Sequence, residues 1–573
     1  MFKARPFRSG IRPFSSASSS KKFHWTRSRQ RLAATSLVVV SVLAYSGLNR
    51  NRIIQNDLLP SSSSKPEEPG PNSDNTLNTL VWGSNKSKRL VPGISDSEVI
   101  RTPAIAKWLD NVALRDLALH KDYAACVDAR GDVYQWGLGT ESPTLILKGQ
   151  ASPHTRFNVE NIVQLQVTEA KVYALSASGK IYAVDADLTR ESLPTRSNST
   201  WWAIGWLWGG ESIGAFQEIV PRSQLSWGEK FISISASDHL LALTSSGRAF
   251  AHPANNNANA YGQLGFRKFD VPDPQSKERI PVELVPKSIA DPYAKASPFK
   301  RATPDSEGTS KKTNPTPLPF CPNLFEIPSL QGVKLSQLVA GGRSSFALTS
   351  TGQVLGWGAN EYGQIGLGNN VTLDTITVPT EVILWRMTSP GDQTKCLSVS
   401  AGGDLTSFTV ERTSQSYAPN ASRTIELLLC GNGQYGSLGN NVYTNAQGSP
   451  TRARSVSNLT EYNDATKNLQ PIGPEAISIS PTGHVLLTLN STGGRDLLVW
   501  GKNYDSELGN GKRSGLAVPT ALTTSDGDRF ILRRKKAKQV LDLQGNVWRR
   551  GVEVEQKAVA GHSSSAVFWK VSM

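Results

Sequence analysis

Two glycine-rich stretches have the spelling of known chemical motifs. Gly210-Glu-Ser212-Ile-Gly214 matches a hydrolase pattern in which a serine nucleophile sits on a sharp strand-to-helix turn and is activated by a histidine and an acid. Gly431-Asn-Gly433-Gln-Tyr-Gly436 matches a dinucleotide-binding loop, which requires a helix whose N-terminus holds the pyrophosphate. Neither stretch is followed by a helical pattern. We therefore predict a protein that is not an enzyme and binds no cofactor.

Histidine and cysteine give no support to a metal site. The seven histidines are dispersed, and the chain has no Cys-X-X-Cys or His-Glu-X-X-His pattern. His239 and His484 occupy equivalent positions in two repeats, and we expect turn residues there rather than paired ligands. Cys126 and Cys430 replace apolar repeat residues and are predicted to be buried thiols.

All of these residues lie in or near a tandem repeat. One half of the repeat is a phrase of the type Trp-Gly-x-Asn-x-x-Gly-Gln-Leu-Gly, found at residues 354–366, 428–439 and 498–509 and, shortened, at 261–265. The other half alternates apolar and small residues around glycine turns, which predicts short antiparallel strands. Seven copies of this second half begin near Leu117, Leu165, Ile232, Leu338, Leu397, Ile477 and Ala558. Such units bury their apolar faces against one another.

The pattern resembles the repeats of the regulator of chromosome condensation family, from about Asn78 to the C-terminus. The resemblance implies an all-β fold, a seven-bladed β-propeller. The last unit, residues 559–568, ends before its Trp-Gly strand, and Thr79-Leu-Val-Trp82-Gly at the other end supplies the missing piece. We expect the N-terminal and C-terminal segments to share one blade and close the ring.

The first residues have the composition of a targeting segment and a membrane anchor. Residues 1–31 are rich in Lys, Arg and Ser without any acid, as in mitochondrial transit peptides. Leu32 to Leu48 is an uncharged apolar run flanked by arginines, and at about 1.5 Å per residue it can span roughly 25 Å as a helix. Residues 49–77 are predicted to be a flexible linker, and 78–573 the propeller.

Charge is concentrated in the first residues. Residues 1–52 contain eleven Lys or Arg and no acid. The remainder of the chain therefore has 51 of the 62 basic residues and all 47 acidic residues. A near-neutral ring argues against a nucleic-acid partner, although a basic DNA-binding arm is the rival interpretation of the first residues. The positive flank before Leu32 favours a propeller in the intermembrane space over one in the matrix.

Three segments could recognise a partner. A low-complexity insertion at about 268–323 is either a loop without a role or a partner-binding arm. A tryptophan cluster belongs either to outer strands of the second blade or to an exposed surface: Trp201, Trp202, Trp206 and Trp208. A basic block is either a solvated loop or a contact for anionic lipid, RNA or acidic protein: Arg533, Arg534, Lys535, Lys536 and Lys538.

The layout is similar to that of fungal mitochondrial inner-membrane members of the family, which are implicated in assembly of respiratory complex III. The resemblance implies a single-pass, membrane-tethered scaffold whose partners are proteins of the respiratory chain or their assembly factors. Two alternatives stay open: a guanine-nucleotide exchange factor for an organellar GTPase, and a factor associated with the mitochondrial ribosome or RNA.

Overall fold

The computed structural model describes residues 76–92, 98–137, 140–148, 161–187, 216–272, 278–290, 321–385, 392–414, 423–464, 467–524 and 526–572. The chain divides into two units, residues 1–71 and 72–573, and all described residues belong to the second. The predicted transit peptide, the membrane span at Leu32 to Leu48 and nearly all of the linker lie outside the described residues and stay predictions. Within the described ranges, no helix is long and apolar enough to cross a membrane.

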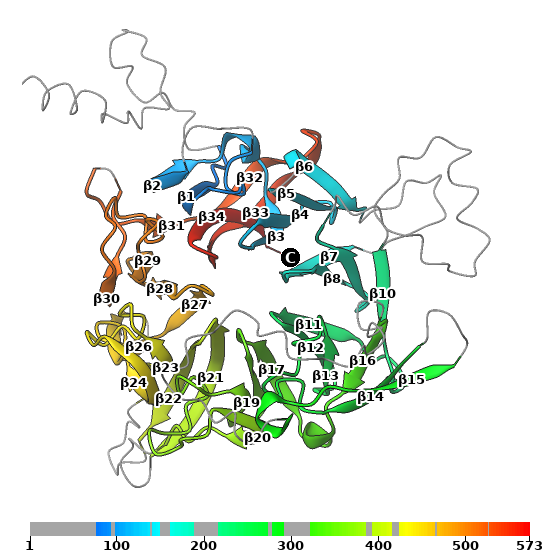
Figure 1. Ribbon diagram of the computed structural model, residues 1–573. Helices are drawn as coiled ribbons and strands as arrows, with labels where there is room; N and C mark the ends of the chain where they lie inside the picture. Colours follow the sequence, from blue (N-terminus) through cyan, green and yellow to red (C-terminus); the bar gives the residue numbers. More distant parts are fainter. Residues whose placement is uncertain are drawn as a thin grey trace, which may run out of the picture. The chain divides into compact units, whose positions relative to one another are not determined.

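Strands of the second unit form seven antiparallel groups of four, or blades, arranged in a ring (Figure 1). Given from the innermost to the outermost strand, the first three blades are as follows. Blade 1 is β3 (Leu114–Leu119), β4 (Tyr123–Asp128), β5 (Val133–Gly137) and β6 (Thr140–Leu147). Blade 2 is β7 (Ile162–Val167), β8 (Lys171–Ser176), β9 (Ile181–Asp185) and β10 (Phe216–Pro221). Blade 3 is β11 (Phe231–Ala236), β12 (His239–Thr244), β13 (Ala249–Pro253) and β16 (Asn323–Glu326).

The other four blades follow the same order. Blade 4 is β17 (Leu335–Ala340), β18 (Ser344–Thr349), β19 (Val354–Ala359) and β20 (Thr375–Glu381). Blade 5 is β21 (Gln393–Gly402), β22 (Leu405–Thr413), β23 (Arg423–Gly433) and β24 (Thr444–Arg452). Blade 6 is β27 (Pro474–Ile479), β28 (His484–Ser491), β29 (Gly494–Gly501) and β30 (Leu516–Ala521). Blade 7 is β33 (Val547–Gly561), β34 (Ser564–Val571), β1 (Leu80–Ser84) and β2 (Val99–Ile105).

Smaller elements are added to the ring. Strand β31 (Ile531–Leu532) pairs with β29, and β32 (Arg534–Leu541) pairs with the first part of β33. Two separate hairpins are β14 (Lys268–Pro272) with β15 (Arg279–Glu283), and β25 (Leu459–Asn463) with β26 (Asn468–Ile472). Within the described ranges, the helical segments are α2 (Lys287–Ala290) and the 3-10 turns at Lys107–Leu109 and Pro328–Leu330.

The hydrophobic core lies between the blades. The second strands of the blades are buried along most of their length, and β18 is buried at every position, because these strands are covered on both faces by neighbouring blades. Seven hydrophobic clusters lie one at each blade junction. At the junction of blades 4 and 5, for example, the rings of Phe346 and Phe408 meet edge to face with centroids 6.2 Å apart.

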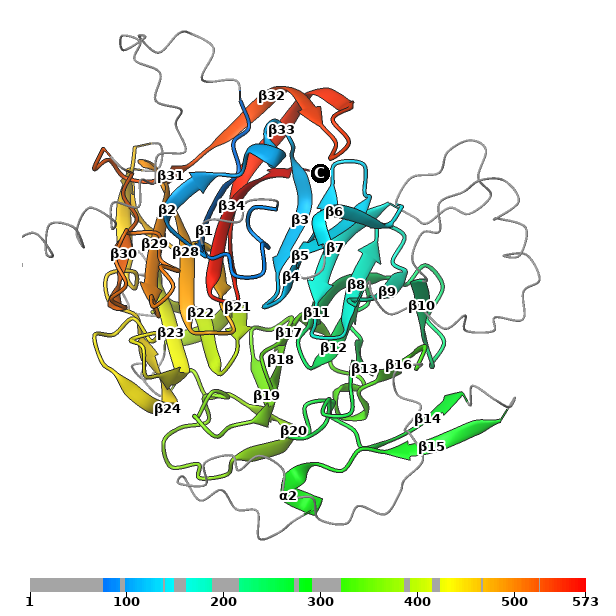
Figure 2. The same cartoon turned by 45° about the horizontal axis from the view of Figure 1, so that its top comes forward.

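The two ends of the described chain close the ring. Strand β1 pairs antiparallel with β34, with Leu80 opposite Val567 and Val81 opposite Ala566 (Figure 2). The innermost strands contact one another in the order β3, β7, β11, β17, β21, β27 and β33, and β33 also contacts β3. The predicted sharing of one blade by both ends is confirmed, and so is the predicted all-β propeller.

A tryptophan links neighbouring blades at four junctions of the described residues. Each indole N–H donates to a backbone carbonyl in the loop after the third strand of the preceding blade. The pairs are Trp82 with Glu507 at 2.7 Å, Trp136 with Arg89 at 2.7 Å, Trp357 with Gln263 at 2.9 Å, and Trp500 with Ser437 at 2.8 Å. In blade 5 the Cys430 thiol takes the tryptophan position and donates to the Gln364 carbonyl at 3.3 Å. The repeated phrase therefore connects blades as well as forming strands.

The insertion predicted at about 268–323 needs correction at both ends. Its first residues form the β14–β15 hairpin, whose Phe269, Val271 and Val282 share a buried cluster with Phe325. Its last residue, Asn323, begins β16, which pairs antiparallel with β13 and parallel with β10 of the preceding blade. The composition did not reveal these elements because their apolar residues are few and widely spaced. Residues 291–320 lie outside the described ranges.

Replacing Trp500 by Phe tests the contact between blades. The substitution keeps most of the buried ring and leaves the Ser437 carbonyl without its indole donor, so we expect the free energy of unfolding to fall by about 1–3 kcal/mol. Trp227→Phe is the matched control because that side chain is fully exposed. Urea unfolding followed by circular dichroism measures both variants, and equal stabilities would contradict the proposed role of the indole.

Candidate functional site

The two histidines singled out by the sequence are buried network residues, so their prediction as turn residues is wrong. His239 and His484 begin β12 and β28 and have no exposed surface. Each places Nε2 next to a serine hydroxyl of the following blade, His239 at 2.6 Å from Ser345 Oγ and His484 at 3.1 Å from Ser565 Oγ. The position looked like a turn because it directly follows the hairpin bend.

Each serine hydroxyl donates to the same loop carbonyl that accepts the tryptophan N–H. Ser345 donates to the Gln263 carbonyl and Ser565 to the Glu507 carbonyl, both at 2.8 Å. Because the single hydroxyl proton is used there, each histidine must be the donor at Nε2. Burial lowers the pKa of both histidines to about 3. These neutral, enclosed rings are structural and are not available as general bases.

The cysteines and the nucleotide-like motif also serve the fold. Cys126 and Cys430 are fully buried, as predicted, and burial raises the pKa of both thiols. At the glycine motif, β23 continues through Gly433 and a turn follows, which confirms the predicted blade loop. The serine motif at Ser212 lies outside the described residues. Within the described ranges, no group of three or more His, Cys, Asp or Glu side chains is placed to hold a metal ion.

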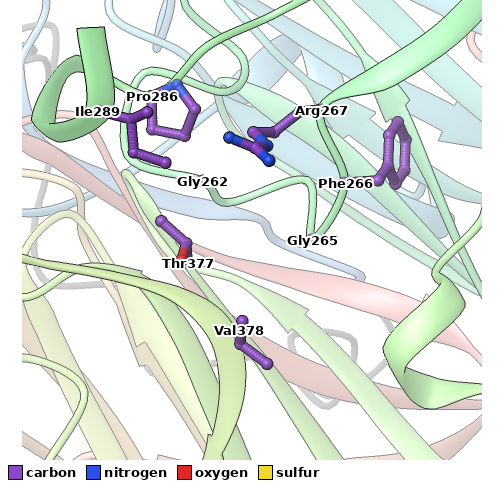
Figure 3. Close-up of a pocket in the computed structure, with 8 residues that line it drawn as sticks. All are labelled: Gly262, Gly265, Phe266, Arg267, Pro286, Ile289, Thr377 and Val378. Atoms are coloured by element: carbon purple, nitrogen blue, oxygen red, sulfur yellow. The ribbon is translucent and has the colours of Figure 1, made fainter.

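A small surface depression lies between the loop of blade 3 and strand β20 of blade 4, beside α2 (Figure 3). It has a volume of about 270 Å³. The lining residues are Gly262, Gly265, Phe266, Arg267, Pro286, Ile289, Thr377 and Val378. Arg267 is the one charged side chain among them, and the lining has no carboxylate, histidine or thiol. The depression therefore lacks groups for acid–base or nucleophilic chemistry.

The loops that carry the repeated phrase meet on one face of the ring. They follow the third strand of a blade, which runs in the same direction in every blade, and the turns between first and second strands lie at the same end. We call this end the loop face. Tyrosines of equivalent repeat positions lie there in three successive blades, Tyr261, Tyr362 and Tyr435, and are partly exposed.

Arg343 organises a polar cluster on the loop face. Its guanidinium contacts Glu361 at 2.6 Å and Asp404 at 2.9 Å, and it donates to the Tyr261 hydroxyl at 2.7 Å while lying over that ring. These residues come from blades 3, 4 and 5. Burial acts to lower the pKa of Arg343, but the carboxylates of Asp404 and Glu361 outweigh it and raise the pKa above its ordinary value. The arginine therefore stays charged and fixes the loops of three blades.

A second cluster lies on the loops of blades 5 and 6. The Lys502 ammonium lies 5.9 Å from the ring centre of Tyr435 and 5.8 Å from that of Tyr504, and the two rings meet edge to face. Tyr504 is 59% exposed. Tyr and Arg are the residue types enriched at the energetic centres of protein interfaces. With both charge signs present, the loop face suits a protein partner better than a nucleic acid.

The predicted basic block forms strands, so its interpretation as a solvated loop is wrong. Arg533 lies between β31 and β32, and the other four residues, Arg534, Lys535, Lys536 and Lys538, lie within β32. Arg534 pairs with Glu555 at 3.0 Å and also with Glu475. Lys535 donates to the Thr76 carbonyl at 2.8 Å and lies over the Trp569 ring. The block was not recognised as a strand because its apolar residues Ala537 and Val540 are three positions apart and do not show the alternation typical of a strand.

The structure describes only one of the two predicted groups of recognition residues. The tryptophan cluster from Trp201 to Trp208 lies outside the described residues, and the basic block belongs to blade 7. The loop-face clusters around Arg343 and Lys502 were missed. The Tyr-Gly step repeated in the phrase at residues 261, 362 and 435 was the signal that could have indicated them.

Comparison with protein families and known proteins supports the repeat. A model of the regulator of chromosome condensation (RCC1) repeat matches residues 351–408, and a second model of that repeat matches 336–364. Protein FMP25, mitochondrial, of Saccharomyces cerevisiae is 21% identical over 520 residues, 86% of this chain and 72% of that protein. The mitochondrial RCC1 domain-containing protein RUG3 of Arabidopsis thaliana is 30% identical over 193 residues, 30% of this chain and 42% of RUG3.

Solved structures show the same fold. Prp20p of Saccharomyces cerevisiae, a structure described together with binding to Gsp1p and histones, matches with a TM-score of 0.51 and 15% identity over 87% of this chain and 93% of that chain. Human WBSCR16 matches with a TM-score of 0.50 and 14% identity over 87% of this chain and its own whole length. At these identities the likeness concerns the β-propeller fold alone.

The buried histidines predict sensitivity to acid. Their pKa is about 3 in the folded state and roughly 6.5 in an unfolded chain, so the unfolded state binds more protons and stability falls as pH drops from 6.5 towards 3. At pH 5 each histidine costs about 2 kcal/mol relative to pH 7.5. Between pH 7.5 and pH 5, we expect the free energy of unfolding of His484→Gln to fall by about 2 kcal/mol less than that of the wild type. Urea unfolding at the two pH values measures this difference.

Ser565→Ala is the matched control for this comparison. It removes the hydroxyl partner and keeps the buried histidine, so stability should fall at both pH values while the acid sensitivity stays. If His484→Gln has the pH dependence of the wild type, burial of this ring is not the source of acid sensitivity.

Proposed function

We propose that this chain, a β-propeller protein built from regulator of chromosome condensation repeats, is a mitochondrial, membrane-tethered scaffold without enzymatic activity that assists the assembly of respiratory complex III. The alignment with mitochondrial FMP25 over 86% of the chain carries the proposal. The basic, acid-free first residues and the apolar run Leu32 to Leu48 support the location and the tether. The resemblance to fungal inner-membrane members of the family supplies the complex III partner.

A scaffold role fits the placement of the reactive side chains. The described cysteines are buried, and the two network histidines are hydrogen-bonded inside the junctions between blades. The residues offered to solvent on the loop face include tyrosines and paired charges held by several blades at once. Such a surface is rigid before binding, so little conformational entropy is lost from it when a partner binds.

Complementation of a deletion strain tests the assembly role. We expect loss of the protein to reduce mature complex III on native gels, and the Tyr504→Ala variant to restore complex III poorly, because truncating an interface tyrosine commonly weakens binding about tenfold or more. Tyr462→Ala is the matched control: this tyrosine is 53% exposed, close to the 59% of Tyr504, and lies on the β25–β26 hairpin away from the phrase loops.

Other outcomes of the same strains would favour the alternatives. Normal complex III with impaired mitochondrial translation, seen by labelling of newly made proteins, would replace the assembly role with the ribosome-associated one. Stimulated nucleotide release from a copurifying GTPase would favour an exchange factor. If the two tyrosine variants restore complex III equally well, Tyr504 is not part of the surface that binds the partner.

Protease protection tests the side on which the propeller lies. We propose the intermembrane space, because more positive charge precedes Leu32 than follows Leu48 and the positive flank tends to stay in the matrix. Protease should therefore degrade the propeller in mitoplasts with a ruptured outer membrane and leave it intact in whole mitochondria. Protection in mitoplasts would place the propeller in the matrix.

A further inference from the structure

Strand β32 and the first part of β33 form a hairpin with a strongly basic surface. We call residues 534–554 the basic hairpin. Four basic side chains on it are exposed and make no ion pair with any described residue: Lys536, Lys538, Arg549 and Arg550. The nearby acids offset this charge only in part, since Glu553 stands opposite Lys536 and Glu555 is engaged by Arg534. The surface is therefore net positive.

Apolar and aromatic groups accompany the charge near the turn of the hairpin. Val547 is 44% exposed, and the Arg549 guanidinium lies 5.2 Å from the centre of the half-buried Trp548 ring. Tryptophan is enriched at membrane–water interfaces, where its ring sits at headgroup level.

The basic hairpin lies at the end of blade 7 opposite the loop face. Strand β33 ends at Gly561 and turns at His562, whose N–H contacts the Leu119 carbonyl in the neighbouring turn of the loop face. The first part of β33 must therefore lie at the other end of the blade. The described chain also enters the ring there, because Lys535 binds the Thr76 carbonyl and Leu77 packs with Ala537 and Val552.

We propose that the basic hairpin binds the anionic phospholipid headgroups of the membrane to which the chain is tethered; this inference rests on the tether in the proposed function. Lys and Arg near an anionic bilayer each add about fivefold to binding. The predicted linker, residues 49–77, reaches the ring beside the hairpin, so a tether would hold this surface close to the bilayer. The placement of this charge beside the chain entry favours a membrane over RNA as the bound surface.

Cleavage of the reconstituted full chain tests the inference. A protease site placed within residues 60–71 allows the propeller to be cut from the tether after reconstitution. The vesicles contain either phosphatidylcholine alone or phosphatidylcholine with a third phosphatidylglycerol. After cleavage, we expect the propeller to float with anionic vesicles, to leave neutral vesicles, and to be released by high salt.

Two fourfold variants with equal charge change complete the test. The hairpin variant carries K536Q, K538Q, R549Q and R550Q, and we expect its binding to anionic vesicles to fall on the order of 100-fold or more. The control variant carries K86Q, K121Q, K512Q and R513Q, all exposed on loops of the loop face, and should bind as the wild type. Circular dichroism and thermal unfolding establish that both variants fold.

The outcomes separate the two proposals. If the uncut protein fails to float with neutral vesicles, the proposed membrane tether is wrong. Binding of the hairpin to anionic vesicles can still be measured in that case. Release of the cut wild type from anionic vesicles, or equal binding by both variants, would overturn the lipid inference. If the cut wild type instead retains a single-stranded RNA probe that only the hairpin variant loses, the surface is an RNA site.

Discussion

A carbonyl in the loop of one blade, bonded by the tryptophan of the next, is the contact on which the ring depends. Around Gln263 and Glu507 the same carbonyl also accepts the serine hydroxyl that the buried histidine supports. The indole is enclosed at these junctions, so an unmatched N–H or carbonyl would carry a desolvation cost. The blades that carry such a donor are therefore held in register with their predecessors by polar geometry as well as by the hydrophobic cluster between them.

The same constraint explains where the repeat is incomplete. Blade 1 passes from β5 at Gly137 almost directly to β6 at Thr140 and has no phrase loop, and the following blade has Val184 in place of tryptophan. Wherever the structure describes a phrase loop, an N–H or S–H donor follows in the next blade, as with Arg89 before Trp136 and Gln364 before Cys430. Loop and donor thus vary together because one would be unsatisfied without the other.

Sequence alone could predict the blades because their signals are local. Strand alternation, glycine turns and the Trp-Gly step recur within some sixty residues, and the missing strand of the last repeat was visible as the spare one at Trp82. The histidine networks could not be predicted, since His239 meets Ser345 across 106 residues. Arg89 is a harder case: it is 3% exposed and binds carbonyls in the turns at His120 and His562, which are contacts that only the closed ring creates.

Closure by strands from both chain ends also separates the two surfaces. The N-terminal strand β1 must run alongside β34, so the chain enters blade 7 at the end away from the loop face, next to the base of the basic hairpin. The sequence contains both the basic block and the phrase loops but does not show where they lie relative to one another in the ring. Strand direction puts them at opposite ends of the ring, so a surface near Thr76 can face a membrane while the tyrosines and Arg343 stay open to a protein.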